Sequence, residues 1–384
     1  MKLPKYQPGT TTAIVYTIAE TTGYAHYTAS TTDPVASGES ITNKQDETEA
    51  YAKKAWKNAD GSTTAPSGAS VVYTLYANSE ATKYTVTLDG TADASAPDVT
   101  GGYESEPWKA MFVHLPEVDK DGKKITYTIA ETTGYDLYMA STEEPVESGE
   151  TITNIRITGD LEVTKTVVSK VEGDDKAAFE FTVTLSDTTI EGTYGDMTFT
   201  AGKATFKLKN GETATATGLP TEVTFTVTET ENPDFTTTMT GDTGTIATTT
   251  SKAEFTNTRI TTAVTVKKVW EDNNNSGKKR PASLKVTLKA NGKEIKTVTL
   301  NEGNKWKTTV SDLPFSEGGK KITYTWTEEE IKNYTLTSTK TSTDGLETTL
   351  TNKVKTTPGG GGTPFTPDDD LGMGMLINVG DCLE

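Results

Sequence analysis

Residues 263–270 have the sequence AVTVKKVW, in which every second residue from Val264 to Trp270 is apolar except Lys268. Side chains at positions i, i+2 and i+4 of a β-strand lie on the same face of the strand. The alternation therefore predicts a strand whose buried face carries the amine of Lys268. Because a buried amine is costly on its own, polar partners are expected elsewhere in the chain.

Two earlier lysines have the same phase. Lys165 follows Val163 at a spacing of two residues, and Lys54 follows Ala52 in the same way. The apolar set around Lys54 is weaker because alanine buries little surface, and the adjacent Lys53 offers an alternative register. The pattern therefore predicts three buried lysines, with Lys53 open as the alternative to Lys54.

A glutamate and an asparagine follow each lysine, again in phase with apolar residues. Glu328 continues the alternating run that begins at Ile322, and Asn352 follows Leu350 at a spacing of two. An amine, a carboxyl and an amide on buried faces need a joint explanation. The alternative is that they are strand-edge polar residues whose side chains reach water. The three triplets are Lys54, Glu131 and Asn154; Lys165, Glu229 and Asn257; and Lys268, Glu328 and Asn352.

An internal duplication shows that the chain is built from repeated units. Residues 14–43 and 125–154 align without gaps and differ at eight of 30 positions, and looser copies occur at 222–259 and 321–354. Such self-similarity indicates tandem domains. The predicted divisions are 1–47, the second half of a domain; 48–156, 157–261 and 262–356, three full domains; and 357–384, a Gly/Pro linker and tail.

Composition predicts the fold class and excludes several functions. Short runs rich in Thr, Val and Tyr between Gly, Pro, Asn and Asp predict an all-β protein of tandem β-sandwiches. The net charge of −17 disfavours nucleic acid and anionic membranes as partners. The single Cys382 excludes an internal disulfide framework, and His26 and His114 offer little for nucleophilic catalysis or zinc binding. We therefore expect no enzyme acting on an external substrate, no cofactor and no metal.

Three stretches carry a resemblance to a known family. AVTVKKVWEDNNNSGKKRPASLKVTL (263–288), KITYTWTEEE (321–330) and TLTN (349–352) resemble the B-type repeat of Gram-positive collagen adhesins, called Cna-B, and related pilin domains. The resemblance extends over 50–154 and is weaker in 161–258, where the tryptophan after the lysine is missing. It implies a prealbumin-like, or inverse immunoglobulin-like, sandwich in each domain and an elongated rod.

The resemblance also implies a covalent crosslink in each full domain. In the family, a lysine of the first strand forms an isopeptide bond with an asparagine of the last strand, and a glutamate that hydrogen-bonds the amide carbonyl promotes the reaction. Burial suits this chemistry because it favours the neutral amine and the neutral carboxyl. The implied residues are Lys54, Lys165 and Lys268 as nucleophiles, Asn154, Asn257 and Asn352 as acceptors, and Glu131, Glu229 and Glu328 as promoters.

Residues 1–47 match only the second half of a domain. They contain Glu20 and Asn43 at the positions of the glutamate and the asparagine, but no lysine strand, so an incomplete site is predicted. The chain thus begins in mid-domain. Either it is a fragment, or the half-domain accepts a lysine strand from another chain.

The implied function is a monomeric structural stalk of a bacterial cell-surface adhesin or pilus-like protein. The sequence contains no evident signal peptide, membrane span or sorting signal, so an extracellular, cell-wall location rests on the resemblance alone. The alternative is an adhesive module that binds a host matrix protein or glycan directly. The irregular segment 92–108, around Tyr103 and Trp108, is its candidate surface.

Other polar clusters have ordinary explanations. Residues 272–277 imitate the start of an EF-hand loop, but Ser283 stands where the bidentate glutamate belongs, so a polar turn is expected. The acidic cluster 368–370 and Cys382 are expected in a solvated tail, with an intermolecular disulfide as the alternative for Cys382.

Overall fold

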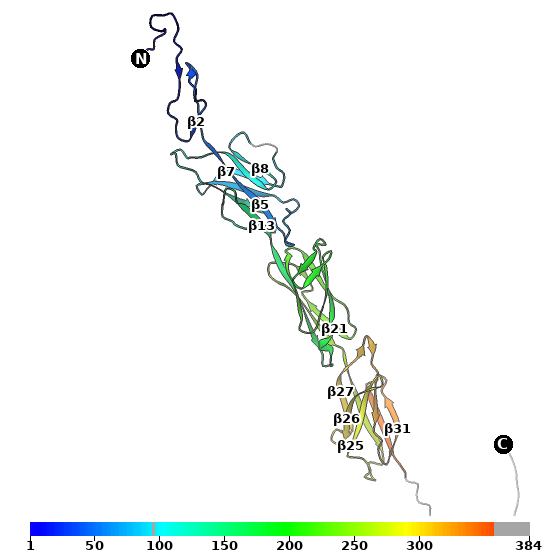
Figure 1. Cartoon of the computed structure of the whole chain (residues 1–384). Coiled ribbons are helices and arrows are strands. Elements are labelled where there is room, and N and C mark those ends of the chain that lie inside the picture. The colour runs from blue at the N-terminus through cyan, green and yellow to red at the C-terminus, as the bar shows by residue number, and fades with distance from the viewer. Residues whose placement is uncertain (94–96, 357–384) are drawn as a thin grey trace, which may run out of the picture. The chain divides into compact units, whose positions relative to one another are not determined.

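The computed structural model describes residues 1–93 and 97–356, and it divides into two compact units, Met1–Arg259 and Ile260–Glu384. The predicted linker and tail, with the acidic cluster 368–370 and Cys382, lie outside the described residues. The all-β prediction is confirmed, because the described elements are strands apart from one 3-10 turn, η1 (Asp174–Lys176) (Figure 1). No helix in the described part is long and apolar enough to cross a membrane.

Residues 1–47 contain four short strands and no core. β1 pairs with β3, and β2 pairs with β4, both antiparallel. None of these 47 residues is buried. A segment that buries no apolar side chain gains little hydrophobic stabilisation of its own. The strands are β1 (Thr17–Ile18), β2 (Tyr27–Ala29), β3 (Val35–Ala36) and β4 (Asn43–Gln45).

The first sandwich packs a five-stranded sheet, β11-β13-β5-β9-β8, on a four-stranded sheet, β12-β10-β6-β7. Its first strand, β5, and its last strand, β13, are parallel neighbours (Figure 1). The strands are β5 (Glu47–Lys57), β6 (Val71–Ala77), β7 (Glu80–Leu88), β8 (Gly101–Glu106), β9 (Lys109–Pro116), β10 (Tyr127–Thr133), β11 (Tyr138–Ala140), β12 (Val146–Glu147) and β13 (Thr151–Arg156).

Tyr73 compensates for the small residues of β5. Ala50 and Ala52 are buried and leave room in the core, and the side chain of Tyr73 on the facing sheet is fully buried in the same cluster. The equivalent positions of the third sandwich are Val264 and Val266, which fill more volume themselves. The weak apolar pattern before Lys54 is therefore a difference in how one core is filled.

The second sandwich has two four-stranded sheets, β19-β14-β23-β21 and β18-β15-β20-β22, and a separate hairpin, β16-β17. Its first and last strands, β14 and β23, are again parallel neighbours. The strands are β14 (Thr158–Val168), β15 (Phe179–Leu185), β16 (Gly192–Tyr194), β17 (Met197–Phe199), β18 (Lys203–Leu208), β19 (Thr213–Pro220), β20 (Thr224–Glu229), β21 (Phe235–Thr240), β22 (Thr243–Thr245) and β23 (Ser251–Arg259).

The third sandwich consists of the sheets β27-β24-β32-β31 and β26-β25-β30, with the small hairpin β28-β29. Its first strand begins at Thr261, one residue before the predicted domain start, and is parallel to the last. The strands are β24 (Thr261–Glu271), β25 (Ser283–Ala290), β26 (Lys293–Asn301), β27 (Lys307–Pro314), β28 (Ser316–Glu317), β29 (Lys320–Lys321), β30 (Tyr324–Glu328), β31 (Tyr334–Thr341) and β32 (Glu347–Val354).

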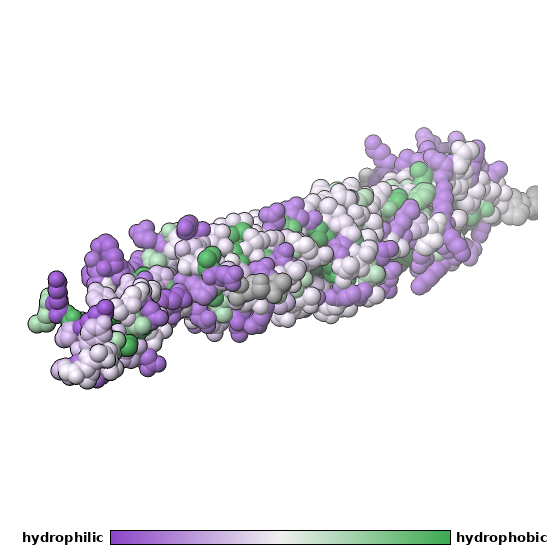
Figure 2. Space-filling view, turned by 90° about the horizontal axis from the view of Figure 1, so that it is seen from above, coloured by the Kyte–Doolittle hydropathy of each residue, from purple (hydrophilic) through white to green (hydrophobic). Residues whose placement is uncertain are grey.

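The surface is mostly hydrophilic on the face that Figure 2 draws. On the face drawn in Figure 2, hydrophobic residues are scattered among hydrophilic ones. Singly exposed apolar residues are normal on soluble proteins and do not mark a binding site.

Candidate functional site

The first and last strands of the three sandwiches pair in the same parallel register. In the third sandwich Lys268 lies opposite Leu350, and Trp270 lies opposite Asn352. Each asparagine therefore lies two residues beyond the partner of the lysine, on the same face of the sheet. The equivalent pairs are Lys54 with Ile152 and Trp56 with Asn154, and Lys165 with Phe255 and Val167 with Asn257.

Each glutamate comes from the facing sheet. Glu229 and Glu328 are the last residues of β20 and β30, and Glu131 lies near the end of β10. Their side chains are 2% (Glu131), 4% (Glu229) and 5% (Glu328) exposed, and the side chains of the three paired lysines are fully buried. The structure thus brings each predicted triplet together inside a core.

The third triplet has all three contacts. Lys268 Nζ lies 2.7 Å from Glu328 Oε2 and also donates a hydrogen bond to Asn352 Oδ1. Asn352 Nδ2 donates to Glu328 Oε1 at 2.7 Å. The amine therefore lies against the side-chain amide that it is predicted to attack.

The second triplet keeps two of these contacts. Lys165 Nζ donates to Glu229 Oε2 at 2.7 Å, and Asn257 Nδ2 donates to Glu229 Oε1 at 2.5 Å. Asn257 Oδ1 is buried and has no hydrogen-bond partner among the described residues. Such a carbonyl oxygen is costly, and a donor from the lysine would satisfy it.

The first triplet is arranged similarly but less tightly. Lys54 Nζ lies 3.0 Å from Glu131 Oε2 and 3.5 Å from the backbone oxygen of Ile152. Asn154 Nδ2 donates to Glu131 Oε1 at 2.7 Å, and Asn154 Oδ1 is another buried oxygen without a partner in the described chain. Lys54 is buried, whereas the alternative, Lys53, is exposed.

The contact made by the glutamate differs from the one that the resemblance implies. In all three sites the carboxylate accepts from the amide nitrogen, and the amide carbonyl is left for the lysine or for no partner. The physical reason is that an ionised carboxylate can only accept hydrogen bonds, so it faces the NH₂ group and the amine. Each carboxylate therefore bridges the two nitrogens that exchange places in amide transfer.

Burial shifts the protonation of the lysines toward the neutral amine. Desolvation lowers the pKa of Lys54 to about 8, although the attraction of Glu131 opposes the shift. Desolvation also lowers the pKa values of Lys165 and Lys268, although the hydrogen bonds that these amines donate to Glu229 and Glu328 oppose the shift. A proton that moves from Nζ to the carboxylate converts the ion pair into a neutral amine and a neutral acid.

Aromatic rings cover the three amines. The Nζ atoms of Lys54, Lys165 and Lys268 lie 4.7, 4.4 and 5.1 Å from the ring centroids of Trp56, Phe179 and Trp270. Such rings exclude water while their faces attract residual positive charge.

Two loop tryptophans complete the cover in the first and third sites, and the sequence analysis missed this role. The backbone oxygens of Trp108 and Trp306 accept from the amide nitrogens of Lys54 and Lys268, each at 2.8 Å. Both residues have a left-handed backbone, with φ of 66° and 56°, and both rings stack edge-on against the strand tryptophan. Sequence reasoning could not find these two tryptophans from a common spacing, because the chain between the lysine and the tryptophan differs in length in the two domains.

Trp108 is therefore not the exposed anchor of an adhesive surface. Its ring packs against the core of the first sandwich, beside Trp56. The buried carboxylate of Glu104 accepts the backbone N–H groups of Asp89 and Gly90, just before the irregular segment, and of Trp108 at its end. Tyr103 is half-buried on the edge strand β8.

The incomplete site has the same asparagine–glutamate contact in an open setting. Asn43 Nδ2 donates to Glu20 Oε1 at 3.1 Å, and the bond is exposed. Residues 1–47 place no lysine beside it among their ion pairs and hydrogen bonds. The half-domain therefore presents an acceptor and a carboxylate without a nucleophile.

The polar turn after Trp270 has a structural role. Arg280 donates two hydrogen bonds to the Asp272 carboxylate, at 2.7 and 2.6 Å, and the Tyr334 hydroxyl donates a third at 2.8 Å. These bonds, led by that from Arg280, hold the pKa of Asp272 far below its usual range. The carboxylate is thus engaged within the protein.

Comparisons with known proteins show the family to which the repeats belong. Residues 50–155 and 264–353 match the model of the Cna protein B-type domain, and residues 159–259 match a domain family of unknown function, DUF7601. The chain is 33% identical over 360 residues to the collagen adhesin of Staphylococcus aureus, covering 90% of this chain and 26% of that protein. It therefore spans about a quarter of the length of this relative.

Two further similarities involve a pilus protein and a solved structure. The pilus tip adhesin Cpa of Streptococcus pyogenes is 40% identical over 88 residues, which cover 21% of this chain and 13% of that protein. The crystal structure of two B repeat units of the collagen binding protein of Staphylococcus aureus is 26% identical, with 92% of this chain and 86% of that chain covered and a TM-score of 0.28.

Proposed function

Because the chain belongs to the family of Cna protein B-type domains, we propose that its sandwiches form a structural stalk of a bacterial cell-surface adhesin or pilus-like protein, crosslinked internally by Lys–Asn isopeptide bonds. The homologous collagen adhesin and pilus tip adhesin support this class of function, and they are adhesins and not enzymes. The surface location is part of the same proposal.

One observation carries the crosslinking proposal. In three separate cores, a buried lysine and an asparagine two residues beyond its cross-strand partner meet the same glutamate. Three buried ion pairs are poor stabilising devices compared with apolar packing, because their desolvation offsets the Coulomb attraction. A reaction that consumes both charges removes this cost.

The proposed reaction is balanced within each site. In the third site, Glu328 Oε2 takes the proton of Lys268 Nζ, and the neutral amine attacks the side-chain carbonyl carbon of Asn352. The carboxyl group, which already contacts Asn352 Nδ2 at 2.7 Å, gives its proton to this leaving nitrogen and takes the second proton of the attacking nitrogen, so that Glu328 ends neutral. One C–N bond forms, one breaks and one ammonia leaves. Lys54 with Asn154 and Lys165 with Asn257 react in the same way.

The position of the bond explains a mechanical role. Tension enters a sandwich through its first strand and leaves through its last strand, and these strands are parallel neighbours. A bond between Lys268 and Asn352 carries the load covalently, so residues 269–351 are bypassed. The closed loop spans 84 residues, which the chain-entropy model converts to about 4 to 5 kcal/mol of stabilisation.

We extend the same chemistry to the incomplete site. Glu20 and Asn43 are proposed to react with a lysine of a first strand supplied from outside residues 1–47. The hydrogen bond between the two side chains and the exposed strand edges around them support this extension. The strand of the sister repeat, residues 47–57, is the natural donor sequence because residues 14–43 duplicate 125–154.

The decisive experiment is the intact mass of the denatured chain, compared with Glu131→Ala, Glu229→Ala and Glu328→Ala. We expect a deficit of three ammonia masses in the parent chain and of two in each variant. Glu329→Ala is the matched control, since Glu329 is adjacent to Glu328 but exposed. A parent chain of full calculated mass refutes the crosslinks and leaves the triplets as buried ion pairs.

A further inference from the structure

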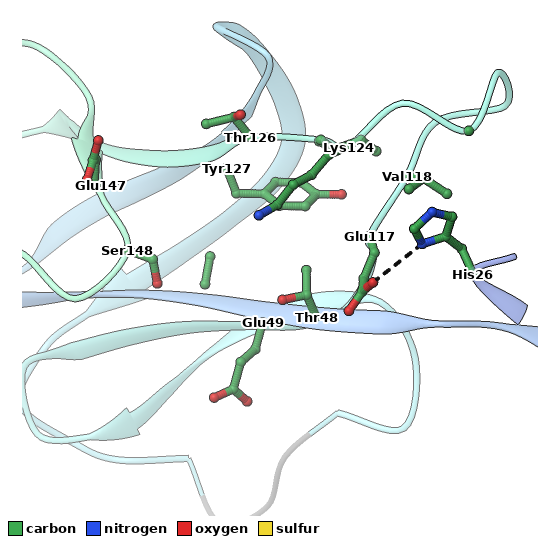
Figure 3. A pocket seen from close by; sticks show the side chains of 13 residues that line it. His26, Thr48, Glu49, Glu117, Val118, Lys124, Thr126, Tyr127, Glu147 and Ser148 are labelled. Carbon is green, nitrogen blue, oxygen red and sulfur yellow. Dashed lines mark ion pairs between the residues drawn. The ribbon is translucent and has the colours of Figure 1, made fainter. Parts of the chain in front are cut away.

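Three side chains that can bind a metal ion meet where residues 1–47 contact the first sandwich, a region called the first junction below. His26 precedes β2, Asp46 lies between β4 and β5, and Glu117 follows β9. One ligand atom of each lies within 4.8 Å of the others, and His26 Nδ1 is 3.9 Å from Glu117 Oε2. Figure 3 shows the imidazole and the Glu117 carboxyl turned toward each other.

Main-chain hydrogen bonds hold these residues in place. The Asp46 N–H donates to His26 O at 2.8 Å, and the Glu117 N–H donates to Asp46 O at 3.2 Å. The Thr28 hydroxyl donates to Asp46 Oδ1 at 2.7 Å, which orients that carboxylate. The three side chains are therefore positioned by the backbone of the junction.

The duplicated sequence provides an internal comparison. At the junction after the first sandwich, the Ile157 N–H donates to Leu137 O at 2.8 Å, and the Thr221 N–H donates to Ile157 O at 3.2 Å. Leu137, Ile157 and Thr221 thus occupy the positions of His26, Asp46 and Glu117. The same backbone forms without ligating side chains, so the junction fold does not require them.

The second junction contains a permanent cation where the first has none. The Arg156 guanidinium donates to the backbone oxygens of Leu137 and Ile157. It also donates to both oxygens of Thr221. Gln45 stands at the position of Arg156, is neutral, and donates to Val118 O at 3.0 Å. At these positions the first junction therefore has two carboxylates that the second does not have, and it has no equivalent of Arg156.

Three of the neighbouring ionisable groups pair with one another. Glu47 lies 3.1 Å from Lys44 Nζ and 2.6 Å from His114 Nδ1. Lys124 and Glu49 line a cavity of about 680 Å³ that opens beside Glu117 (Figure 3). The cavity provides space for the water ligands that a partly coordinated ion keeps.

We propose that His26, Asp46 and Glu117 bind a divalent transition-metal ion, with Zn²⁺ as the reference, and that the ion joins residues 1–47 to the first sandwich. One imidazole nitrogen and two carboxylate oxygens suit zinc-like ions, whereas calcium and magnesium favour all-oxygen sites. Tetrahedral ligands at about 2.1 Å from zinc lie about 3.4 Å apart. The His26 and Glu117 atoms, 3.9 Å apart, must therefore approach by about 0.5 Å, and no pair within the 4.8 Å bound must approach by more than about 1.4 Å. Two carboxylates and a neutral imidazole balance the charge of the ion.

The test is a calorimetric titration of the metal-stripped full chain with ZnCl₂, with Cys382→Ser in every sample to remove the single thiol. We expect one saturable site, weakened by His26→Leu and by Glu117→Thr by more than the roughly 10- to 100-fold that the loss of an outer-shell partner costs. These substitutions introduce the residues of the second junction, and Leu137 has the same left-handed backbone, with φ of 66° against 65° for His26. His114→Asn is the matched control and leaves the affinity unchanged.

Three outcomes overturn the proposal. The first is the absence of saturable Zn²⁺ binding, and the second is binding that survives His26→Leu or that His114→Asn weakens equally. The third is Ca²⁺ binding as tight as Zn²⁺ binding, because it would indicate carboxylate ligands alone. None of these readouts depends on the isopeptide bonds.

Discussion

Lys268 Nζ donates a hydrogen bond to Asn352 Oδ1 across 84 residues of sequence, from the first strand of the third sandwich to the last. The two strands are parallel neighbours, and Asn352 lies two residues beyond Leu350, the cross-strand partner of Lys268. The beginning and the end of the domain therefore meet at a single buried point. A covalent bond placed there closes the whole sandwich.

Glu328→Gln tests whether the glutamate transfers a proton or only positions the amide. The amide oxygen of Gln can accept from one of the two nitrogens, but the amide cannot take a proton from Lys268, so we expect the third crosslink to be absent. The variant also leaves a buried amine without a counter-charge, which costs about 3 to 5 kcal/mol of stability. Intact mass and thermal unfolding measure the two effects.

Glu329→Gln is the control for this substitution and should behave as the parent chain does. If Glu328→Gln loses the same number of ammonia molecules as the parent, the proton-transfer role is wrong and the carboxylate only positions its neighbours.

The stability of an uncrosslinked first sandwich should rise with pH. In Asn154→Ala the bond cannot form, and Lys54 keeps a pKa of about 8 in the folded state against 10.5 in the unfolded chain. Below pH 8 both states hold the proton and the burial penalty is fully present. Between pH 8 and pH 10.5 the unfolded state binds more protons than the folded state. The free energy of unfolding therefore increases with pH, by about 3 kcal/mol over this range.

Urea unfolding of Asn154→Ala at several pH values measures this slope. Lys54→Met combined with Asn154→Ala removes the titrating group and should remove this part of the slope. Equal slopes for the two proteins would show that Lys54 is not desolvated as the structure indicates.

Trp306→Ala should slow crosslinking in the third sandwich without preventing it. The ring packs edge-on against Trp270, which covers Lys268. Removal admits water and raises the pKa of the amine toward its ordinary value, and each unit of that rise lowers the neutral fraction roughly tenfold. A time course of ammonia loss after refolding measures the rate.

Trp306→Phe retains most of the aromatic cover and serves as the comparison. A rate for Trp306→Ala equal to that of the parent would mean that the ring contributes packing alone.

The incomplete site should accept a lysine strand in trans. Incubation of the full chain with a peptide of residues 47–57 should give an adduct of chain plus peptide minus one ammonia, and Asn43→Ala should abolish it. A peptide in which Lys54 is replaced by Met should not react, whereas replacement of Lys53 should be tolerated. Persistent absence of an adduct with the parent chain would reject the proposed role of Glu20 and Asn43.

Much of the fold and of the three sites was predictable because strands have a period of two. The phase of Lys268, Glu328 and Asn352 against their apolar neighbours predicts burial, and the structure buries all three side chains. The same arithmetic failed to separate Lys53 from Lys54, because alanines give a weak signal. In the structure Lys54 is buried and Lys53 is exposed, and Tyr73 lies in the same buried cluster as the two alanines.

The sequence by itself determined the all-β class, the tandem repeats and which residues of each repeat face inward, because these follow from alternation and from duplication. Tertiary structure decided the rest. The parallel register of the first and last strands sets which atoms touch, the facing sheet supplies the carboxylate, and loops of unequal length place Trp108 and Trp306 over the amines. Three distant segments of the chain bring His26, Asp46 and Glu117 together at one junction. Strand alternation describes only neighbouring residues, so it could not predict this contact.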